Sequence, residues 1–319
     1  GLTAQPADNP LFGGGLTLGA GARLTTTGSG NIILVAGSTG SFTNQAGNSA
    51  LSLGSGRWLV YSSDPRSNSG EMAGYDWRRY NATFANSAPA NVSGSGFLHS
   101  VAPTVGITIN GIGSKTYDGT TAVGDASRSL SGSGAGINGD TVTVAVSAGS
   151  GQYADRNAGT GKAVTFTGGP SSLSVTDANG KPVYGYTVSG ITGQGTITQA
   201  GLSVQAADVS KIYGRSDPVL GYTVTGLVAG DSAASVLSGT LQRTAGENTG
   251  RYTIGRGSLT ASGNYSLFFT DGTLAITPAT LSVLAADIGK TYGQSDPVLG
   301  YTVTGLAAGD SAASVLSGT

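Results

Sequence analysis

The sequence contains no cysteine and only one histidine, and the scarcity of these residues excludes several kinds of catalytic and metal-binding site. A Cys/His dyad, a cysteine-rich zinc site and most serine triads need residue types that the chain does not supply. The one histidine, His99, lies in the stretch GFLHSVAP, which we interpret as a linker where the ring packs or faces solvent. Glutamate occurs only at Glu71 and Glu247, so a glycosidase-type carboxylate pair would come mostly from aspartate. We therefore predict a protein that is not an enzyme, with no cofactor and no metal site.

Charge is scarce as well. Charged residues make up 10% of the chain, and 16 Lys and Arg nearly balance 17 Asp and Glu, for a formal net charge of −1. Because no basic patch is available to neutralise phosphates, nucleic acid is not a predicted partner. No run approaches the ~18 apolar residues of a membrane helix, and the first residues lack the pattern of a signal peptide. We expect an export signal upstream of residue 1.

Glycine and strand-forming residues are abundant. The chain has 55 glycines, and apolar residues alternate with small polar ones, as at Val142, Val144 and Val146. Three turn signals separate the alternating runs: Asn138-Gly139-Asp140, Asn179-Gly180-Lys181 and Asp271-Gly272. We predict a hairpin at Asp271-Gly272. The pattern predicts an all-β protein.

One segment is repeated. Residues Leu202 to Thr240 recur from Leu281 to Thr319 with six differences, so the two copies are offset in numbering by 281 − 202 = 79. Tandem copies this similar are typical of a duplicated module that lengthens a molecule. Each copy predicts one short helix, from Asp231 to Leu237 in the first, with Asp231 as its N-cap. The second copy stops about half way through the unit, which indicates a piece of something larger.

The first hundred residues have a different pattern. Short apolar runs recur along this segment, separated by Gly, Ser, Thr and Asn. The runs are Leu16 to Leu18, Asn31 to Ala36, Leu51 to Leu53 and Arg57 to Tyr61. This spacing favours the end of a right-handed parallel β-helix with one coil for each run. An antiparallel sandwich is the alternative.

Residues 57–84 gather both tryptophans and the main charged cluster. The charged residues are Asp64, Arg66, Glu71, Asp76, Arg78 and Arg79, which we interpret as a salt-bridged cap on the coils. The aromatic residues form a candidate ligand surface, because flat rings with polar tips suit sugar faces, but the same rings could bury the last coil. They are Trp58, Tyr61, Tyr75, Trp77 and Tyr80. A carbohydrate-binding or carbohydrate-cleaving β-helix centred on 57–84 is therefore the alternative function.

Two further patterns have structural interpretations. A Lys-x-Tyr unit occurs three times, at Lys115/Tyr117, Lys211/Tyr213 and Lys290/Tyr292. We predict that each tyrosine packs in the core of its own module, under the lysine stem, and repeated ligand contacts are the alternative. The segment Gly159-Thr160-Gly161-Lys162 resembles part of a phosphate-binding loop, but Ala163 replaces the Ser or Thr that binds magnesium, so we predict a turn.

Several of these segments carry a family resemblance. The stretches GNIILVAGSTGSFTNQAG and LSLGSGRWLVYSSDP resemble the C-terminal coils of the filamentous-haemagglutinin-like β-helix of bacterial two-partner-secretion exoproteins. Lys115-Thr-Tyr-Asp-Gly119 resembles the signature of the YDG module that follows such helices. Lys211-Ile-Tyr-Gly-Arg-Ser-Asp-Pro218, and the matching segment from Lys290 to Pro297, resemble the MBG module of the YG type.

The resemblance implies coils followed by small β-rich tandem modules, of a sandwich or a β-grasp-like fold. The implied domains are 1–103 for the last coils and cap, 104–199 for a YDG-like module, 200–279 for an MBG-like module and 280–319 for a truncated second one.

The resemblance also implies a function. It indicates a segment of a secreted or surface-associated adhesin of a Gram-negative-type bacterium, which acts as a stalk or spacer and presents adhesive regions. The implied partner is an outer-membrane β-barrel transporter of the two-partner-secretion type, while the host-cell, matrix or glycan receptor is not indicated. The secretion domain of such exoproteins is missing from this sequence, and so is an Arg-Gly-Asp tripeptide. A stalk that presents a distal toxin is a weaker alternative.

Overall fold

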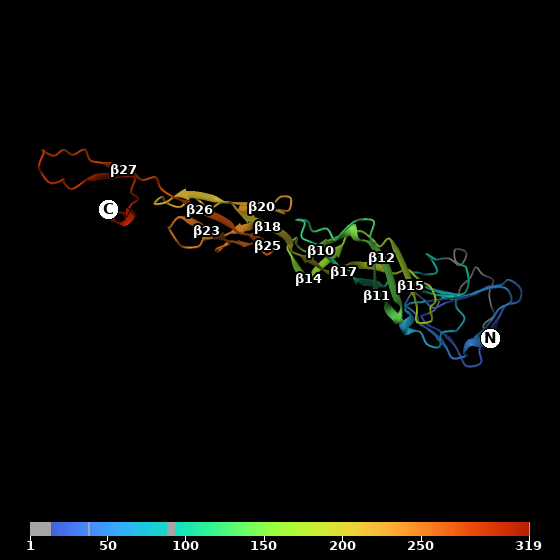
Figure 1. Ribbon diagram of the computed structural model, residues 1–319. Coiled ribbons are helices and arrows are strands. Elements are labelled where there is room, and N and C mark those ends of the chain that lie inside the picture. Colours follow the sequence, from blue (N-terminus) through green and yellow to red (C-terminus); the bar gives the residue numbers. More distant parts are fainter. Residues whose placement is uncertain (1–13, 38, 88–92, 319) are drawn as a thin grey trace. The chain divides into compact units, whose positions relative to one another are not determined.

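Almost all of the regular secondary structure is β-strand. The computed structural model describes residues 14–37, 39–87 and 93–318 (Figure 1). The α-helices in these ranges are two of four residues each, α1 (Ala233–Val236) and α2 (Ala312–Val315). The prediction of an all-β protein is confirmed. No described helix has the length and apolar character that a membrane span needs.

The chain forms two compact units. Unit 1 comprises Gly1–Lys115, Thr121–Asp155 and Gly159–Thr196, and unit 2 comprises Thr116–Thr120, Arg156–Ala158 and Ile197–Thr319. Residues 1–13 of the predicted segment 1–103 lie outside the described residues.

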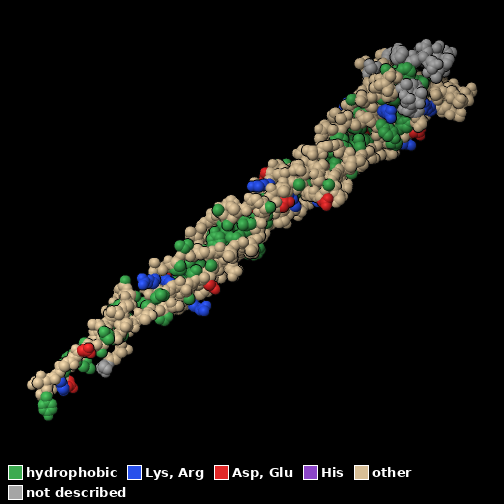
Figure 2. Space-filling view, turned by 90° about the horizontal axis from the view of Figure 1, so that it is seen from above, with side chains coloured by type: hydrophobic (Ala, Val, Ile, Leu, Met, Phe, Trp, Pro, Cys, Tyr) green, Lys and Arg blue, Asp and Glu red, His purple; other side chains and the backbone are tan. Residues whose placement is uncertain are grey.

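Figure 2 shows isolated charged side chains of both signs over the face in view, without a patch of a single sign.

Unit 1 begins with coils that stack in parallel. Three strand pairs form the stack: β1 (Leu16–Leu18) with β4 (Phe42–Asn44), β2 (Leu24–Thr25) with β5 (Leu51–Ser52), and β3 (Ile32–Val35) with β6 (Trp58–Ser62). Leu16 lies opposite Phe42 and Ile32 opposite Trp58, so both pairs show the same offset from one coil to the next (42 − 16 = 26; 58 − 32 = 26). The prediction of one coil for each apolar run is wrong, because β1 and β3 are different strands of the same coil.

Glycine allows these coils to approach each other at their corners. A Cβ atom on Gly56 would lie 1.9 Å from the carbonyl oxygen of Gly30, and one on Gly54 would lie 2.4 Å from that of Gly28. Both pairs have the offset of the coils (56 − 30 = 26; 54 − 28 = 26). No side chain fits between two backbones at such distances, so part of the glycine content follows from the stacking.

The sheet that contains β3 and β6 continues beyond the coils. Its five strands run in the order β16-β7-β8-β6-β3, and all of the pairs are parallel. The added strands are β7 (Trp77–Arg79), β8 (Gly96–His99) and β16 (Val183–Tyr184). Since β16 comes from the predicted segment 104–199, strands from both sides of residue 103 share one sheet within unit 1.

The remainder of unit 1 is organised around an eight-stranded sheet. Its order is β13-β14-β17-β9-β11-β12-β15, and β10 pairs with β17. The bounds are β9 (Thr104–Ile109), β10 (Ser114–Thr116), β11 (Ser129–Ala135), β12 (Thr141–Ser147), β13 (Gly151–Tyr153), β14 (Gly159–Phe166), β15 (Ser172–Thr176) and β17 (Thr187–Thr198). Short 3-10 helices are η1 (Asn48–Ala50), η2 (Pro65–Ser67), η4 (Ile137–Gly139) and η5 (Ala148–Ser150).

The sequence patterns explain this sheet in part. Val142, Val144 and Val146 are buried along β12, as the alternation predicts. Asn138 and its neighbour Gly139 have positive φ angles of 55° and 78°, and they connect the antiparallel strands β11 and β12, so this turn is confirmed. The turn predicted from Gly159 is wrong, because that residue begins strand β14.

The first repeat copy in unit 2 is a β-sandwich. One sheet has the order β20-β18-β25 and the other the order β19-β26-β23-β22. The bounds are β18 (Ala200–Ala206), β19 (Val209–Ile212), β20 (Tyr222–Thr225), β22 (Gln242–Arg243), β23 (Gly250–Gly255), β25 (Tyr265–Thr270) and β26 (Gly272–Thr277). Ala206 of the first sheet packs with Ile254 and Leu274 of the second. Two shorter pairs are β21 (Leu237–Ser238) with β24 (Thr260–Ala261) and β27 (Ser282–Ala285) with β28 (Tyr301–Thr304).

Two local predictions in this copy are wrong. Asp271-Gly272 is not a hairpin turn, because β25 and β26 belong to different sheets and the chain crosses the sandwich there. A Cβ on Gly272 would lie 2.9 Å from the Ala206 carbonyl oxygen, which explains the glycine. The N-cap of α1 is Ser232 rather than Asp231, in a capping box with Ser235. The Asp231 carboxylate is therefore not used as the cap.

Candidate functional site

The five aromatic residues of the candidate ligand surface are buried. Each is at most 8% exposed: Trp58, Tyr61, Tyr75, Trp77 and Tyr80. The rings of Trp58 and Tyr75 both pack edge-on against Phe97, with centroids 5.1 and 5.5 Å away. The structure thus places these rings in the core rather than on a surface where a sugar could stack.

A buried polar cluster lies beside these rings, and Arg78 of β7 is its centre. Arg78 is 5% exposed. Its Nη2 lies 2.5 Å from the Glu71 carboxylate, and its Nε lies 3.3 Å from that of Asp177. Its guanidinium also stacks 4.8 Å from the centre of the Tyr75 ring. Burial opposes the charge of Arg78, but the hydrogen bond to Glu71 raises its pKa, so the side chain stays a cation.

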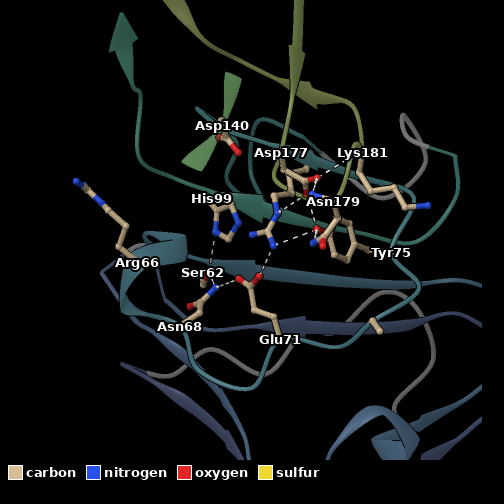
Figure 3. Close-up of polar contacts among 12 residues, drawn as sticks. Ser62, Arg66, Asn68, Glu71, Tyr75, His99, Asp140, Asp177, Asn179 and Lys181 are labelled. Carbon is tan, nitrogen blue, oxygen red and sulfur yellow. Dashed lines mark hydrogen bonds and ion pairs between the residues drawn. The ribbon is translucent and has the colours of Figure 1, made fainter. Parts of the chain in front are cut away.

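Asp177 anchors the other side of the cluster. The Tyr75 hydroxyl donates to one carboxylate oxygen of Asp177, and the backbone N–H groups of Asn179 and Lys181 donate to the other, each at 2.9 Å (Figure 3). Burial alone would raise the pKa of Asp177, but the Tyr75 hydroxyl and these N–H groups lower it below its ordinary value. The turn predicted at Asn179-Gly180-Lys181 therefore exists, and Asp177 holds it.

The predicted salt-bridged cap is found in part. Arg66 pairs with Asp64 at 2.5 Å on the surface, and Arg78 pairs with Glu71. Asp76 instead accepts the backbone N–H of Ser95. Arg79 also has a different contact, since its guanidinium lies over the ring of Tyr184. Asp177 is absent from the sequence prediction because it lies far from Arg78 along the chain (177 − 78 = 99).

His99 is not in a linker, so that part of the prediction is wrong, whereas the predicted packing of its ring is found. It lies in β8, is 0% exposed, and its ring stacks on that of Phe97. The Nδ1 atom lies 3.0 Å from the Ser62 hydroxyl, which also accepts a hydrogen bond from the Asn68 amide (Figure 3). Burial, and then the nearby Arg78 charge, lower the pKa of His99 to about 3. At neutral pH the imidazole is therefore uncharged.

A third carboxylate closes the cluster. The hydroxyls of Tyr80 and Tyr186 both donate to Asp140 Oδ2, at 2.7 and 2.8 Å. Burial raises the pKa of Asp140, while the two hydroxyls oppose that shift. The two rings also meet edge-on, with centroids 5.1 Å apart. The arrangement holds charges in fixed positions inside the protein, and both Ser62 and His99 are buried.

The described residues contain no group of three or more His, Cys, Asp or Glu side chains placed to hold a metal ion.

Unit 2 contains a second charged cluster, which is a network of ion pairs. Lys211 is 8% exposed and pairs with Asp217 at 2.7 Å and with Glu247 at 2.5 Å. Arg243 contacts the same two carboxylates.

The tyrosines of the three Lys-x-Tyr units differ in their surroundings. Tyr117 is buried, Tyr213 packs partly buried against the sandwich core, and Tyr292 is 101% exposed. The prediction that each tyrosine packs in the core of its own module is therefore wrong for Tyr292. The lysine amines of the second and third units pair with carboxylates, Lys211 with Asp217 and Lys290 with Asp296.

Burial of His99 makes the stability of unit 1 depend on pH. The folded pKa of about 3 lies below the ordinary 6.5, so between these values the unfolded chain binds a proton that the folded chain does not. The free energy of unfolding should thus fall by about 1.5 kcal/mol as the pH decreases from 6.5 to 5. The variant His99→Gln should lack this component, so the measurement is the difference between the two proteins in denaturant titrations at each pH. Parallel pH dependences of the two would contradict the prediction.

The chain matches two known domain families, and the boundary between the matches lies close to the boundary between the two units. Residues 102–193 match the YDG domain, and residues 202–275 and 281–319 each match the MBG domain of the YGX type. The chain carries a YDG domain and two MBG regions. No curated protein and no solved structure matches the chain. The first MBG region is the β-sandwich, and Asp140, Asp177 and Asn179 belong to the YDG domain.

The family boundaries give the buried cluster a structural meaning. Arg78, Glu71 and Tyr75 come from the coil segment that precedes the YDG domain, whereas Asp177 comes from the YDG domain itself. The pairing of β7 with β16 also joins these two segments. The cluster therefore ties the YDG domain to the stacked coils within unit 1.

Proposed function

We propose that the chain is a segment of a secreted, surface-associated bacterial adhesin, in which the modules act as a stalk or spacer that presents adhesive regions. The observation that carries the proposal is the near-identical second MBG region. It repeats the short helix with its Ser capping box, as well as the strand Tyr-Thr-Val-Thr, at β28 as at β20. Copies of one small β-module extend a molecule without adding a new reaction.

Export through an outer-membrane transporter of the two-partner-secretion type, a cell-surface location and a non-catalytic role belong to the same proposal. The resemblance of residues 30–47 to the last coils of such exoproteins supports it. The parallel stacking of strands at offsets of 26 or 27 residues (42 − 16 = 26; 51 − 24 = 27; 58 − 32 = 26) supports the interpretation of the coils as the end of a parallel β-helix. The buried cluster supports a structural role, since it connects two segments and exposes no reacting group.

Removal of one repeat tests the proposal. Deleting residues 202–280 from the surface-displayed protein removes one complete repeat period and puts Leu281 in the place of Leu202. We expect cells that carry the shortened protein to keep their adhesion to host-cell monolayers, with a tag at the far end of the stalk closer to the membrane.

A matched control keeps the length of the stalk. Replacing residues 202–240 by the sequence of 281–319 changes only the six differing positions and leaves the number of modules unchanged. This variant should adhere like the original protein, with the tag at its original distance. Complete loss of adhesion in the deletion variant, with normal display, would contradict a role as a spacer.

A further inference from the structure

Within unit 2, a tyrosine of the YDG domain contacts an aspartate of the first MBG region. The Tyr117 hydroxyl donates to the Asp231 carboxylate at 3.0 Å. The Tyr265 hydroxyl donates to the same carboxylate at 2.7 Å, and the two rings meet edge-on with centroids 5.5 Å apart. Tyr117 belongs to the first Lys-x-Tyr unit, and Asp231 to the Gly-Asp loop before α1. Because Ser232 caps that helix, the carboxylate is available for the two tyrosines.

The contact recurs one repeat later. The Tyr213 hydroxyl lies 3.3 Å from the carboxylate of Asp310, which is the counterpart of Asp231 (310 − 231 = 79). The Asp310 charge raises the pKa of the Tyr213 phenol, so the proton stays on the donor. Two consecutive modules thus present the same kind of donor to the same position of the module that follows.

A glycine one or two residues after each tyrosine lies close to a second matching position of the next module. A Cβ on Gly119 would lie 3.2 Å from Val228, and one on Gly214 would lie 2.4 Å from Ala307. Val228 and Ala307 are counterparts (307 − 228 = 79). Both glycines have positive φ angles, of 79° and 76°. At both boundaries, the tyrosine lies against the aspartate of the Gly-Asp loop and the glycine lies against the residue three positions before that aspartate.

The second contact borders a pocket of about 390 Å³ lined by Tyr213, Leu306, Ala307 and Asp310, among others. At the first contact Tyr265 completes the binding of the carboxylate, whereas residues 281–319 correspond to 202–240 and include no counterpart of Tyr265.

We propose that the Lys-x-Tyr loop of each module is a docking element for the Gly-Asp loop of the MBG module that follows it. The second MBG region contains the same element, since Lys290 and Tyr292 repeat the Lys-x-Tyr unit, Gly293 has a φ of 90°, and Lys290 pairs with Asp296 as Lys211 does with its counterpart. The partner that fits is the Gly-Asp loop of another MBG-type module, with a carboxylate acceptor and a small apolar residue three positions earlier. This inference concerns the order and fixation of the modules and goes beyond a spacer role.

Distance measurements between two spin labels test the docking in the full chain. The protein has no cysteine, so Thr253→Cys on β23 and Thr302→Cys on β28, both at exposed positions, would be the only label sites. We expect one dominant narrow distance. Removing the hydroxyl with Tyr213→Phe should lower the ratio of docked to undocked populations about tenfold, as loss of a hydrogen bond to a charged group does.

A double-mutant cycle and a matched control identify the cause. Asp310→Ala should have the same effect as Tyr213→Phe, and combining the two should add little, because both remove one bond. Tyr301→Phe removes the hydroxyl of a tyrosine in the same region that is 54% exposed, and it should leave the distances unchanged. Equal broadening in Tyr301→Phe, or no change in Tyr213→Phe, would overturn the proposal.

An extended chain tests the docking element at Tyr292. Adding a second copy of residues 241–319 after Thr319 completes the second MBG region and supplies a new Gly-Asp loop. A label at Thr302→Cys and one at its counterpart in the added copy should report one narrow distance, which Tyr292→Phe should broaden. A broad distribution in the extended chain before this substitution would refute the docking role of Tyr292.

Discussion

Replacing Arg78 by methionine should lower the free energy of unfolding of unit 1 by about 3–5 kcal/mol, because a buried and a partly buried carboxylate lose their cation. Glu71 and Asp177 both contact the Arg78 guanidinium, which is 5% exposed. Methionine fills a similar volume and tolerates an irregular core, so a cavity contributes little to the loss. The measurement is unfolding in denaturant followed by tryptophan fluorescence. Both tryptophans, Trp58 and Trp77, lie in the core of unit 1 and report on it within the full chain.

The surface pair of Arg66 and Asp64 provides the matched control. The Arg66 side chain is 58% exposed. Arg66→Met should therefore change the free energy of unfolding by less than about 1 kcal/mol, as is usual for exposed ion pairs. Similar losses in the two variants would show that the Arg78 cluster does not hold the YDG domain to the coils. Restoration of most of the stability in Arg78→Met by Glu71→Gln would identify the unpaired carboxylate as the cause.

Local patterns predicted the strands and several turns because they depend on neighbouring residues alone. The alternation of Val142, Val144 and Val146 places one face of β12 in the core wherever the strand pairs. Asn138 tolerates a positive φ angle, and this makes the turn between β11 and β12 readable from the sequence. The duplication at residue 281 was similarly visible, because it requires comparison of the chain with itself only.

Contacts between distant segments were not predictable from such patterns. Asp177 has the same local signals as any turn-forming aspartate, and nothing near it in the sequence indicates Arg78 as its partner. The hairpin expected at Asp271-Gly272 has correct turn residues, yet the next strand, β26, joins the other sheet of the sandwich, where it pairs with β19 and β23. His99 reads as part of a linker because its burial comes from strands that surround it in space.

The repeated docking contact was predictable from the sequence only in part. Each Lys-x-Tyr unit and each Gly-Asp loop was visible as a recurring motif, but recurrence alone is equally consistent with packing inside each module. The hydrogen bonds from Tyr117 to Asp231 and from Tyr213 to Asp310 pair a motif of one module with a motif of the next. When the motifs recur at a constant spacing along the chain, only the three-dimensional structure distinguishes a contact within a module from a contact between modules.

A single methyl group at Gly56 should destabilise the stacked coils. In Gly56→Ala the new Cβ would lie 1.9 Å from the carbonyl oxygen of Gly30 in the preceding coil. Backbone atoms cannot rotate away as a side chain can, so the two coils must separate at this corner. We expect the free energy of unfolding of unit 1 to fall by about 1–3 kcal/mol, as in overpacked cores. Tryptophan fluorescence in denaturant is again the measurement, because Trp58 lies in β6, close to Gly56 in the chain.

Gly19→Ala separates this steric effect from the general effect of replacing glycine. A Cβ on Gly19 would meet no atom within 4 Å, and its φ angle is not in the positive region. Alanine restricts the unfolded chain equally at both sites, which by itself favours folding by about 0.4–1 kcal/mol. The control should therefore be neutral or slightly more stable, and the contrast between the variants measures the cost of separating the coils. Equal stability of the two would mean that the coils do not stack with Gly56 against Gly30, the register that the structure shows.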